Sequence, residues 1–212
     1  MHDGVVQDLV EAWAALLARH TADPDAGAVG GRLLASWSEP HRRYHAISHL
    51  RDILIHVDEL ATYADDIDAV RLAAWYHDAV YQGRPDDEER SARRAHDELS
   101  GLGVSPDLVD EVARLVRMTT SHDPEPGDRN GETLSDADLA SLAIPRDSYA
   151  ANTAAIRHEY AHVSDEDWVT GRLRVLVALL AAPRVFRTDY GRETWELAAR
   201  ENMRAELRSM GR

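Results

Sequence analysis

The feature that most constrains the fold is the stretch Leu72–Val80, which is apolar except for the adjacent pair His77 and Asp78. A run of this kind is typical of a buried helix, and a charged side chain at its end needs a partner because burying it alone is costly. A divalent metal suits the pair, since it supplies positive charge to the aspartate and accepts a neutral nitrogen from the histidine. Alternatively, hydrogen bonds at the helix end satisfy the His-Asp pair without a metal. The dipeptide by itself favours this second explanation, because short motifs often occur by chance.

The kind of metal site is limited by the absence of cysteine from the 212 residues. Disulfides, thiolate nucleophiles and zinc-thiolate sites are excluded, which leaves His, Asp and Glu as ligands to consider. Such ligands suit a divalent ion of Mn, Fe, Mg, Co or Zn, so the residue types alone do not choose the metal.

The net charge of −14 limits the partners. It argues against nucleic acid, because a protein that binds the phosphate backbone relies on a basic face. A small anionic substrate stays open, since a metal and a few arginines can reverse the field inside one cleft. No stretch reaches the roughly 18 consecutive apolar residues of a membrane span, and no basic leader precedes an apolar run at the start. We therefore expect no membrane partner and a cytoplasmic location.

Apolar residues recur at steps of three and four along most of the chain, which predicts an all-helical fold. No segment has the two-residue period of a strand. Turn-rich segments lie at 81–85 and 123–131, and Pro183 and residues 189–191 mark the last break. The expected helices cover residues 5–19, a short run ending near Trp37, 45–61, 67–80, a helix that opens with the acidic run 86–89, 105–121, 134–140, 149–160, 165–180 and 192–208.

The predicted helix 45–61 carries the next candidate ligands. At about 100° per residue, His45, His49, Asp52 and His56 follow one edge of its apolar stripe. A solvated polar margin would explain this edge as well. His49 lies closest to the apolar face and one turn from His45, so one of these two histidines could face a cleft lined by the core.

The short apolar segment 134–140 also has carboxylates set into it, at Asp136 and Asp138. Four positions stand out, namely His49, His77, Asp78 and Asp138, and together they could form an octahedral site for one metal ion. With these residues the chain resembles the HD superfamily of metal-dependent phosphohydrolases, in which a histidine, a His-Asp doublet and a distant aspartate lie on an all-helical scaffold. The resemblance is to one bacterial branch of predicted phosphohydrolases and covers nearly the whole chain. It is carried by Tyr44–Leu50, Ala74–Tyr81, Asp87–Ala92 and Leu134–Leu139, and continues through Ile156–Tyr160, Gly171-Arg172 and Ala199–Asn202.

This resemblance implies an HD-domain-like helical bundle, with residues 1–212 as a single domain. Its core would span roughly residues 44–142, and the N- and C-terminal helices would pack on it. The implied metal ligands are His49, His77, Asp78 and Asp138. His45 and Asp136 stay open as alternatives to His49 and Asp138, and His122 is a further candidate that could hold a second ion.

The implied function is hydrolysis of a small phosphorylated metabolite, with nucleotides as the favoured class, through a metal-bound hydroxide. Asp78 would act as ligand and proton acceptor, and Glu88 or Glu89 would assist it. Arg84, Arg90 and Arg157 are candidates for binding phosphate oxygens, because a guanidinium can donate two parallel hydrogen bonds.

Two other functions are compatible with the sequence. A catalytically silent HD-like module would sense a ligand or bind a protein and use a metal only for structure. A purely structural bundle would bind no metal. Whatever the function, the last predicted helix, with Trp195, Leu197, Ala198 and Met203, could be a surface for homo-oligomer formation.

Overall fold

The helix around which the others pack is α4 (Ile67–Tyr76). The side chains of Leu72–Tyr76 are almost completely inaccessible to solvent. Asp66 caps the start of the helix by accepting hydrogen bonds from the backbone N–H groups of Asp68 and Ala69. Helices α3, α5, α6 and α7 pack around α4. The apolar stretch that dominates the sequence is therefore the centre of the core.

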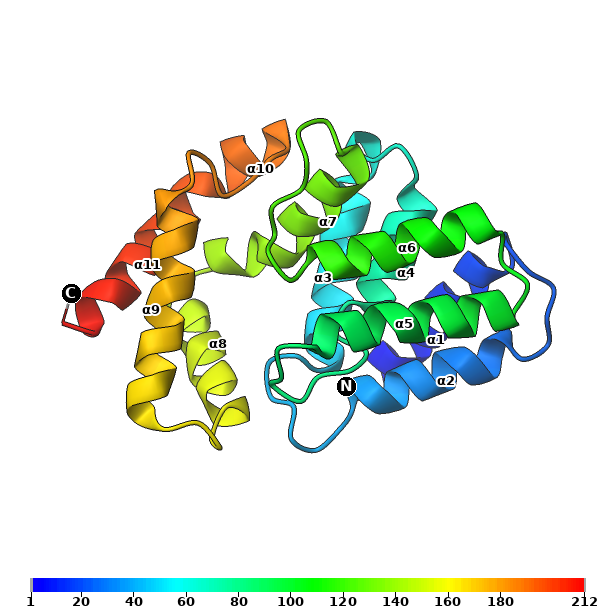
Figure 1. The fold of residues 1–212 in the computed structure, drawn as a ribbon, viewed down its shortest axis with the longest axis horizontal. Coiled ribbons are helices and arrows are strands. Elements are labelled where there is room, and N and C mark those ends of the chain that lie inside the picture. The colour runs from blue at the N-terminus through cyan, green and yellow to red at the C-terminus, as the bar shows by residue number, and fades with distance from the viewer. Residues whose placement is uncertain (1, 212) are drawn as a thin grey trace.

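The computed structural model describes residues 2–211, and these contain α-helices and two 3₁₀ helices but no β-strand. The predicted all-helical fold is confirmed, and the helices form one compact domain (Figure 1). No helix within residues 2–211 combines the length and hydrophobicity needed to cross a bilayer. Besides α4, the helices are α1 (His2–Leu17), α2 (Ala26–Trp37), α3 (Ile47–Glu59), η1 (Ala61–Tyr63), α5 (Asp87–Gly101), α6 (Pro106–Met118), α7 (Arg129–Leu139), η2 (Ala140–Ala143), α8 (Arg146–Glu159), α9 (Asp165–Ala181), α10 (Asp189–Thr194) and α11 (Glu196–Ser209).

Helices α1 and α2 cover one side of α4, and their contact depends on Gly30. A Cβ atom at this position would lie 2.3 Å from Cδ1 of Trp13. The indole of Trp13 also donates a hydrogen bond to the carbonyl of Ala26 and meets Trp75 edge to face. The absent side chain thus lets α2 approach the tryptophan that joins it to the core.

Helix α4 ends at Tyr76, earlier than the predicted end at residue 80, so His77 and Asp78 lie in the turn that follows. The reason is tertiary hydrogen bonding to the backbone of this turn. Arg42 donates to the carbonyl of Asp78 at 2.7 Å, and Ser91 accepts from the N–H of Val80 at 3.0 Å. These contacts occupy backbone groups that another helical turn would have used.

Two other helix boundaries differ from the prediction because of side-chain caps. Asp128 accepts from the N–H of Gly131, so α7 begins at Arg129 inside the segment expected to be a turn-rich loop. Thr188 accepts from the N–H of Gly191, so the expected break at residues 189–191 forms the short helix α10 instead. A capped first turn is stable even where glycine lowers helix propensity.

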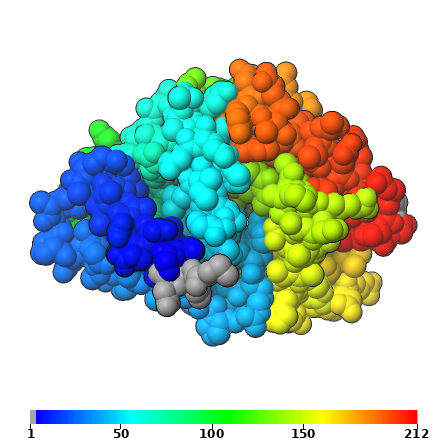
Figure 2. All heavy atoms as spheres, turned by 180° about the vertical axis from the view of Figure 1, so that it is seen from behind, coloured from blue at the N-terminus to red at the C-terminus, as the bar shows by residue number. Residues whose placement is uncertain are grey.

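Helices α8 to α11 lie beside the other helices, as Figure 1 shows, and from behind α3 is seen between the N-terminal helices and α8 (Figure 2). Side-chain to backbone hydrogen bonds hold this C-terminal part in place. Asn202 donates to the carbonyls of Leu142 and Ile144. Asp136 accepts from the N–H groups of Arg187 and Thr188. The C-terminal helices are thereby fixed against the end of α7 and the segment after it.

Candidate metal centre

His77 is oriented by the backbone of α4. Its Nδ1 donates to the carbonyl of Ala74 at 2.9 Å, because a carbonyl can only accept. In the neutral ring this leaves the lone pair on Nε2. A hydrogen bond of this kind to a backbone carbonyl is the usual arrangement for a histidine that binds metal through its other nitrogen.

Three further side chains face Nε2 of His77, two from other helices and one from the neighbouring residue of the same turn. Nε2 of His49, from α3, lies 3.3 Å away. Oδ1 of Asp138, from α7, lies 3.8 Å from His77 and 3.1 Å from Nε2 of His49. Oδ2 of Asp78 lies 3.1 Å from Nε2 of His77 and 4.0 Å from that of His49. The ligand atoms of His49, His77 and Asp138 all lie within 4.8 Å of one another.

The electrostatics of this group reflect buried opposite charges. Burial lowers the pKa of His77, but the carboxylates of Asp78 and Asp138 outweigh it and raise that pKa to about 9. Burial opposes ionisation of the two carboxyl groups as well, yet the His77 charge holds the pKa of both well below the usual range. Protonated His77 therefore balances the negative charges of Asp78 and Asp138 within this group.

The donor set fits a divalent cation. Two imidazoles and a carboxylate converge in a buried place, and a second carboxylate lies beside them. A cation would supply the positive charge that otherwise falls to protonated His77, and the hydrogen bond to Ala74 leaves Nε2 ready to bind it. The group of His49, His77 and Asp138 could therefore hold a metal ion.

His122 lies next to this group. Its Nε2 is 3.4 Å from Oδ2 of Asp138, the oxygen that does not face His49. The backbone φ of His122 is 50°, a left-handed conformation that is uncommon for a residue with a side chain. Burial lowers the pKa of His122, so the ring favours its neutral form. The turn after α6 thus presents an uncharged imidazole to Asp138.

His45 is directed to a different partner. It precedes α3, and its Nδ1 donates to Oε2 of Glu159 at 2.6 Å. The other carboxylate oxygen of Glu159 accepts the backbone N–H groups of Arg43, Tyr44 and His45. Burial raises the pKa of Glu159, but these donors outweigh it and lower the pKa to about 2. Glu159 therefore fastens the end of α8 to the turn before α3.

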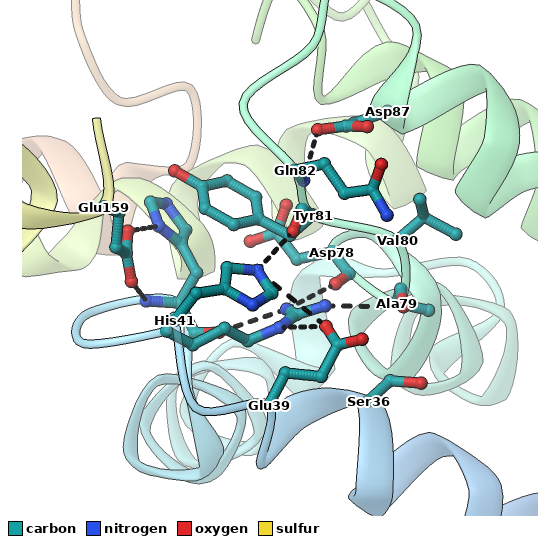
Figure 3. A network of polar contacts seen from close by, with 12 residues as sticks. Ser36, Glu39, His41, Asp78, Ala79, Val80, Tyr81, Gln82, Asp87 and Glu159 are labelled. Carbon is teal, nitrogen blue, oxygen red and sulfur yellow. Dashed lines mark hydrogen bonds and ion pairs between the residues drawn. The ribbon is translucent and has the colours of Figure 1, made fainter. Parts of the chain in front are cut away.

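The polar network around the His-Asp turn is drawn in Figure 3. His41 contacts the carbonyl of Tyr81 at 2.8 Å, and Asp87 accepts from the N–H of Gln82 at 2.6 Å. The ring of Tyr81 stacks on His45 with the ring centroids 4.1 Å apart. Together these contacts fix the chain on the C-terminal side of Asp78.

Asp136 and Asp138 point to opposite sides of α7, since residues two apart in a helix are about 200° apart. Asp136 is buried, and burial raises its pKa to about 6 in spite of the hydrogen bonds it accepts. Its partners are the N–H groups of Arg187 and Thr188 and the hydroxyl of Thr188. The structure therefore joins Asp136 to the C-terminal part of the chain and Asp138 to the histidines.

The two predicted assisting glutamates have different surroundings. Glu88 is half-buried, and burial together with the charge of Asp78 raises its pKa. Glu89 binds Arg93 and Arg117, and these hydrogen bonds lower its pKa to about 2. Glu89 therefore forms surface ion pairs, whereas the pKa of Glu88 is affected by the charge of Asp78 in the metal group.

The three predicted phosphate-binding arginines have other surroundings: one binds backbone carbonyls, one contacts a carboxylate and one lies in an exposed loop. Arg157 donates to the carbonyls of Tyr160 and Val163 and closes the turn between α8 and α9. Arg90 contacts Asp87 at 3.4 Å. Arg84 is exposed in the loop before α5. None of the three lines the cavity beside the metal group.

That cavity has a volume of about 500 Å³ and lies between the metal group and the α8–α9 hairpin. His45, His122 and Asp138 border one end, and Arg174 of α9 is part of the lining. Another cavity, of about 380 Å³, lies beside Arg51 and is lined by none of the ligand candidates. Of the metal group, Asp138 lines the larger of these cavities, and His49 and Asp138 together line a smaller one of about 100 Å³ that Asp52 and His56 also border.

Glu159 and the cavity wall were not identified as functional from the sequence. Glu159 belongs to the segment Ile156–Tyr160 that carries part of the family resemblance, but no local pattern links it to a turn more than 100 residues earlier. The wall residues of α8 and α9 look like ordinary helix positions. The sequence holds one signal for this wall: in residues 165–180, polar and apolar side chains are only weakly separated onto two faces of the helix.

Comparison of the chain with protein-family models, with curated proteins and with solved structures yields no match.

Proposed function

We propose that the protein is a metal-dependent phosphohydrolase that acts on a small phosphorylated metabolite, and that nucleotides are the first class to assay. The observation that carries the proposal is the convergence of His49, His77 and Asp138 within 4.8 Å, next to Asp78 and at the end of a cavity of about 500 Å³. A buried group of this composition beside a cavity is a common arrangement for metal-assisted hydrolysis.

His49, His77 and Asp138 would hold a divalent ion, with Asp78 as a fourth ligand. Bound there, the ion supplies positive charge to a phosphoryl group and makes a water molecule more acidic. The lowered pKa of Asp78 keeps its carboxylate ionised, so it can orient a water molecule by accepting a hydrogen bond. Glu88, whose pKa is raised, is better matched to proton transfer near neutral pH.

His122 and Glu159 would support this chemistry without reacting themselves. Neutral His122 lies at the second oxygen of Asp138 and restrains the rotation of that carboxylate. Glu159 closes the C-terminal helices over the cavity through His45 and the backbone before α3.

The test combines metal analysis with phosphate release. The purified protein is loaded separately with Mn, Fe, Mg, Co or Zn and incubated with nucleoside monophosphates, cyclic nucleotides, deoxynucleoside triphosphates and guanosine tetraphosphate. We expect one ion per chain and turnover of at least one substrate. His77→Ala and Asp78→Ala should lose both metal and turnover, whereas His96→Ala, at an exposed position of α5, should keep both.

Two outcomes would contradict the proposal. Metal retained in the His77→Ala/Asp78→Ala double variant would remove this group as the binding site. Stoichiometric metal without turnover of any phosphate ester would instead favour a silent ligand-sensing or protein-interaction module in which the metal is structural.

A further inference from the structure

The wall of the cavity opposite the metal group combines an aliphatic strip with the polar side chains of Asn152 and Thr153 and two arginines. Ile156 of α8 and Val175 and Leu179 of α9 line it, together with Leu139 and Leu142. Val175 is 50% exposed, although the neighbouring Leu176 is fully buried. Helix α9 therefore packs into the protein through Leu176 and presents the half-exposed side chain of Val175 to the cavity.

An apolar surface of this kind, next to a group that attracts anions when metal is bound, fits an amphiphilic ligand. Its anionic end would lie at the metal group, and its apolar part would remove Ile156, Val175 and Leu179 from water. Two arginines line this wall. Arg172 is paired with Glu206, whereas Arg174 is exposed and adds positive potential to the cavity of a chain whose net charge is −14.

The aromatic residues of the cavity do not offer the free face that a planar base would need for stacking. Tyr44 packs against His45 and His49, with ring centroids 4.7 and 4.9 Å apart. Tyr149 is 6% exposed, and its hydroxyl is hydrogen-bonded to Glu206. The aliphatic side chains are left as the surface for the organic part of a ligand.

We propose that the substrate is a phosphomonoester with an alkyl body, and that Ile156, Val175 and Leu179 recognise that body. This inference rests on the proposed phosphohydrolase function. The inference refines the substrate class: alkyl phosphomonoesters should be better substrates than the nucleotides that are assayed first. Each methylene that is fully buried against this wall strengthens binding about fourfold.

The test measures binding as well as turnover. Methylphosphonate and hexylphosphonate are titrated calorimetrically into the metal-loaded full-length protein, and phosphate release is measured from methyl phosphate and hexyl phosphate. We expect hexylphosphonate to bind at least tenfold more tightly than methylphosphonate, and kcat/KM to follow the same order.

Val175→Asn and Val177→Asn form a matched pair of variants. Val177 is 55% exposed on the same helix but does not line the cavity, and neither change adds charge. Val175→Asn should reduce the preference for the hexyl compound to about threefold or less, with methylphosphonate affinity and metal content unchanged. Val177→Asn should behave as the unmodified protein.

The outcomes separate the two proposals. Chain-length preference in binding without any turnover supports the alkyl-binding wall and refutes the hydrolase. Turnover with equal kcat/KM for methyl and hexyl phosphate, or equal effects of the two asparagine variants, refutes the wall and leaves the hydrolase standing. The absence of both binding and turnover refutes both.

Discussion

Replacing Asp138 by asparagine tests the metal centre most directly, because it removes one negative charge and keeps the shape of the side chain. In the unmodified protein, Oδ1 of Asp138 lies 3.1 Å from Nε2 of His49 and Oδ2 lies 3.4 Å from Nε2 of His122. The two imidazoles hold both carboxylate oxygens in place. An amide at this position can keep those contacts in part but is a much poorer ligand for a divalent cation.

The expected effect follows from the dependence of stability on binding. A cation that binds only the folded chain adds about 2.7 kcal/mol when its concentration is a hundred times Kd. For a chain of 212 residues, each kcal/mol raises the melting temperature by about 2–4 °C, so metal should raise it by about 5–10 °C. If Asp138→Asn raises Kd a hundredfold, the same concentration adds only about 0.4 kcal/mol, or about 1 °C.

The assay is thermal unfolding followed by circular dichroism, with and without Mn, Fe, Mg, Co or Zn. Asp110→Asn is the control, since Asp110 is an exposed carboxylate on α6 and should leave the full shift intact. An equal shift in Asp138→Asn and the unmodified protein, or the absence of a shift with all five metals, would refute the assignment of this group as a metal site.

Three further predictions concern the scaffold. Gly30→Ala should lower the free energy of unfolding by at least about 2 kcal/mol, because its Cβ would overlap the Trp13 ring. A Cβ at Gly31 has no atom within 4 Å, so Gly31→Ala should raise the free energy of unfolding by up to about 1 kcal/mol. Urea unfolding of both variants tests this. The ionised carboxylate of Glu159 stabilises the fold above pH 4.5, and this contribution decreases as the pH falls toward 2. About 2 kcal/mol of the free energy of unfolding should therefore be lost between pH 7 and pH 3. Unfolding experiments at the two pH values test this, and Glu159→Gln should lack this part of the pH dependence. Asp136→Ala should lower the free energy of unfolding by about 2–4 kcal/mol, because it leaves three hydrogen-bond donors without their acceptor. Metal analysis should nevertheless find as much bound ion as in the unmodified protein. Loss of the ion would contradict the separation of Asp136 from the metal group.

The helical fold and much of the candidate site could be predicted from the sequence, because both depend on local patterns. The three- and four-residue spacing of apolar side chains predicts the helices, and the apolar run around His77-Asp78 identifies the helix that is now seen at the centre. The helix ends were less predictable. Tyr76 ends α4 because Arg42 and Ser91 bind the backbone beyond it, and these partners are distant in sequence.

Only the tertiary structure decided which of two similar residues faces the metal group. His45 and His49 are one turn apart in the sequence pattern, but His45 is drawn to Glu159, 114 residues away, while His49 packs beside His77. Asp136 and Asp138 are both set into an apolar segment, and the N–H groups of residues 187–188 engage only Asp136. Local spacing determines which residues share a helix face, whereas the partner of a buried polar group depends on chain segments that only folding brings together.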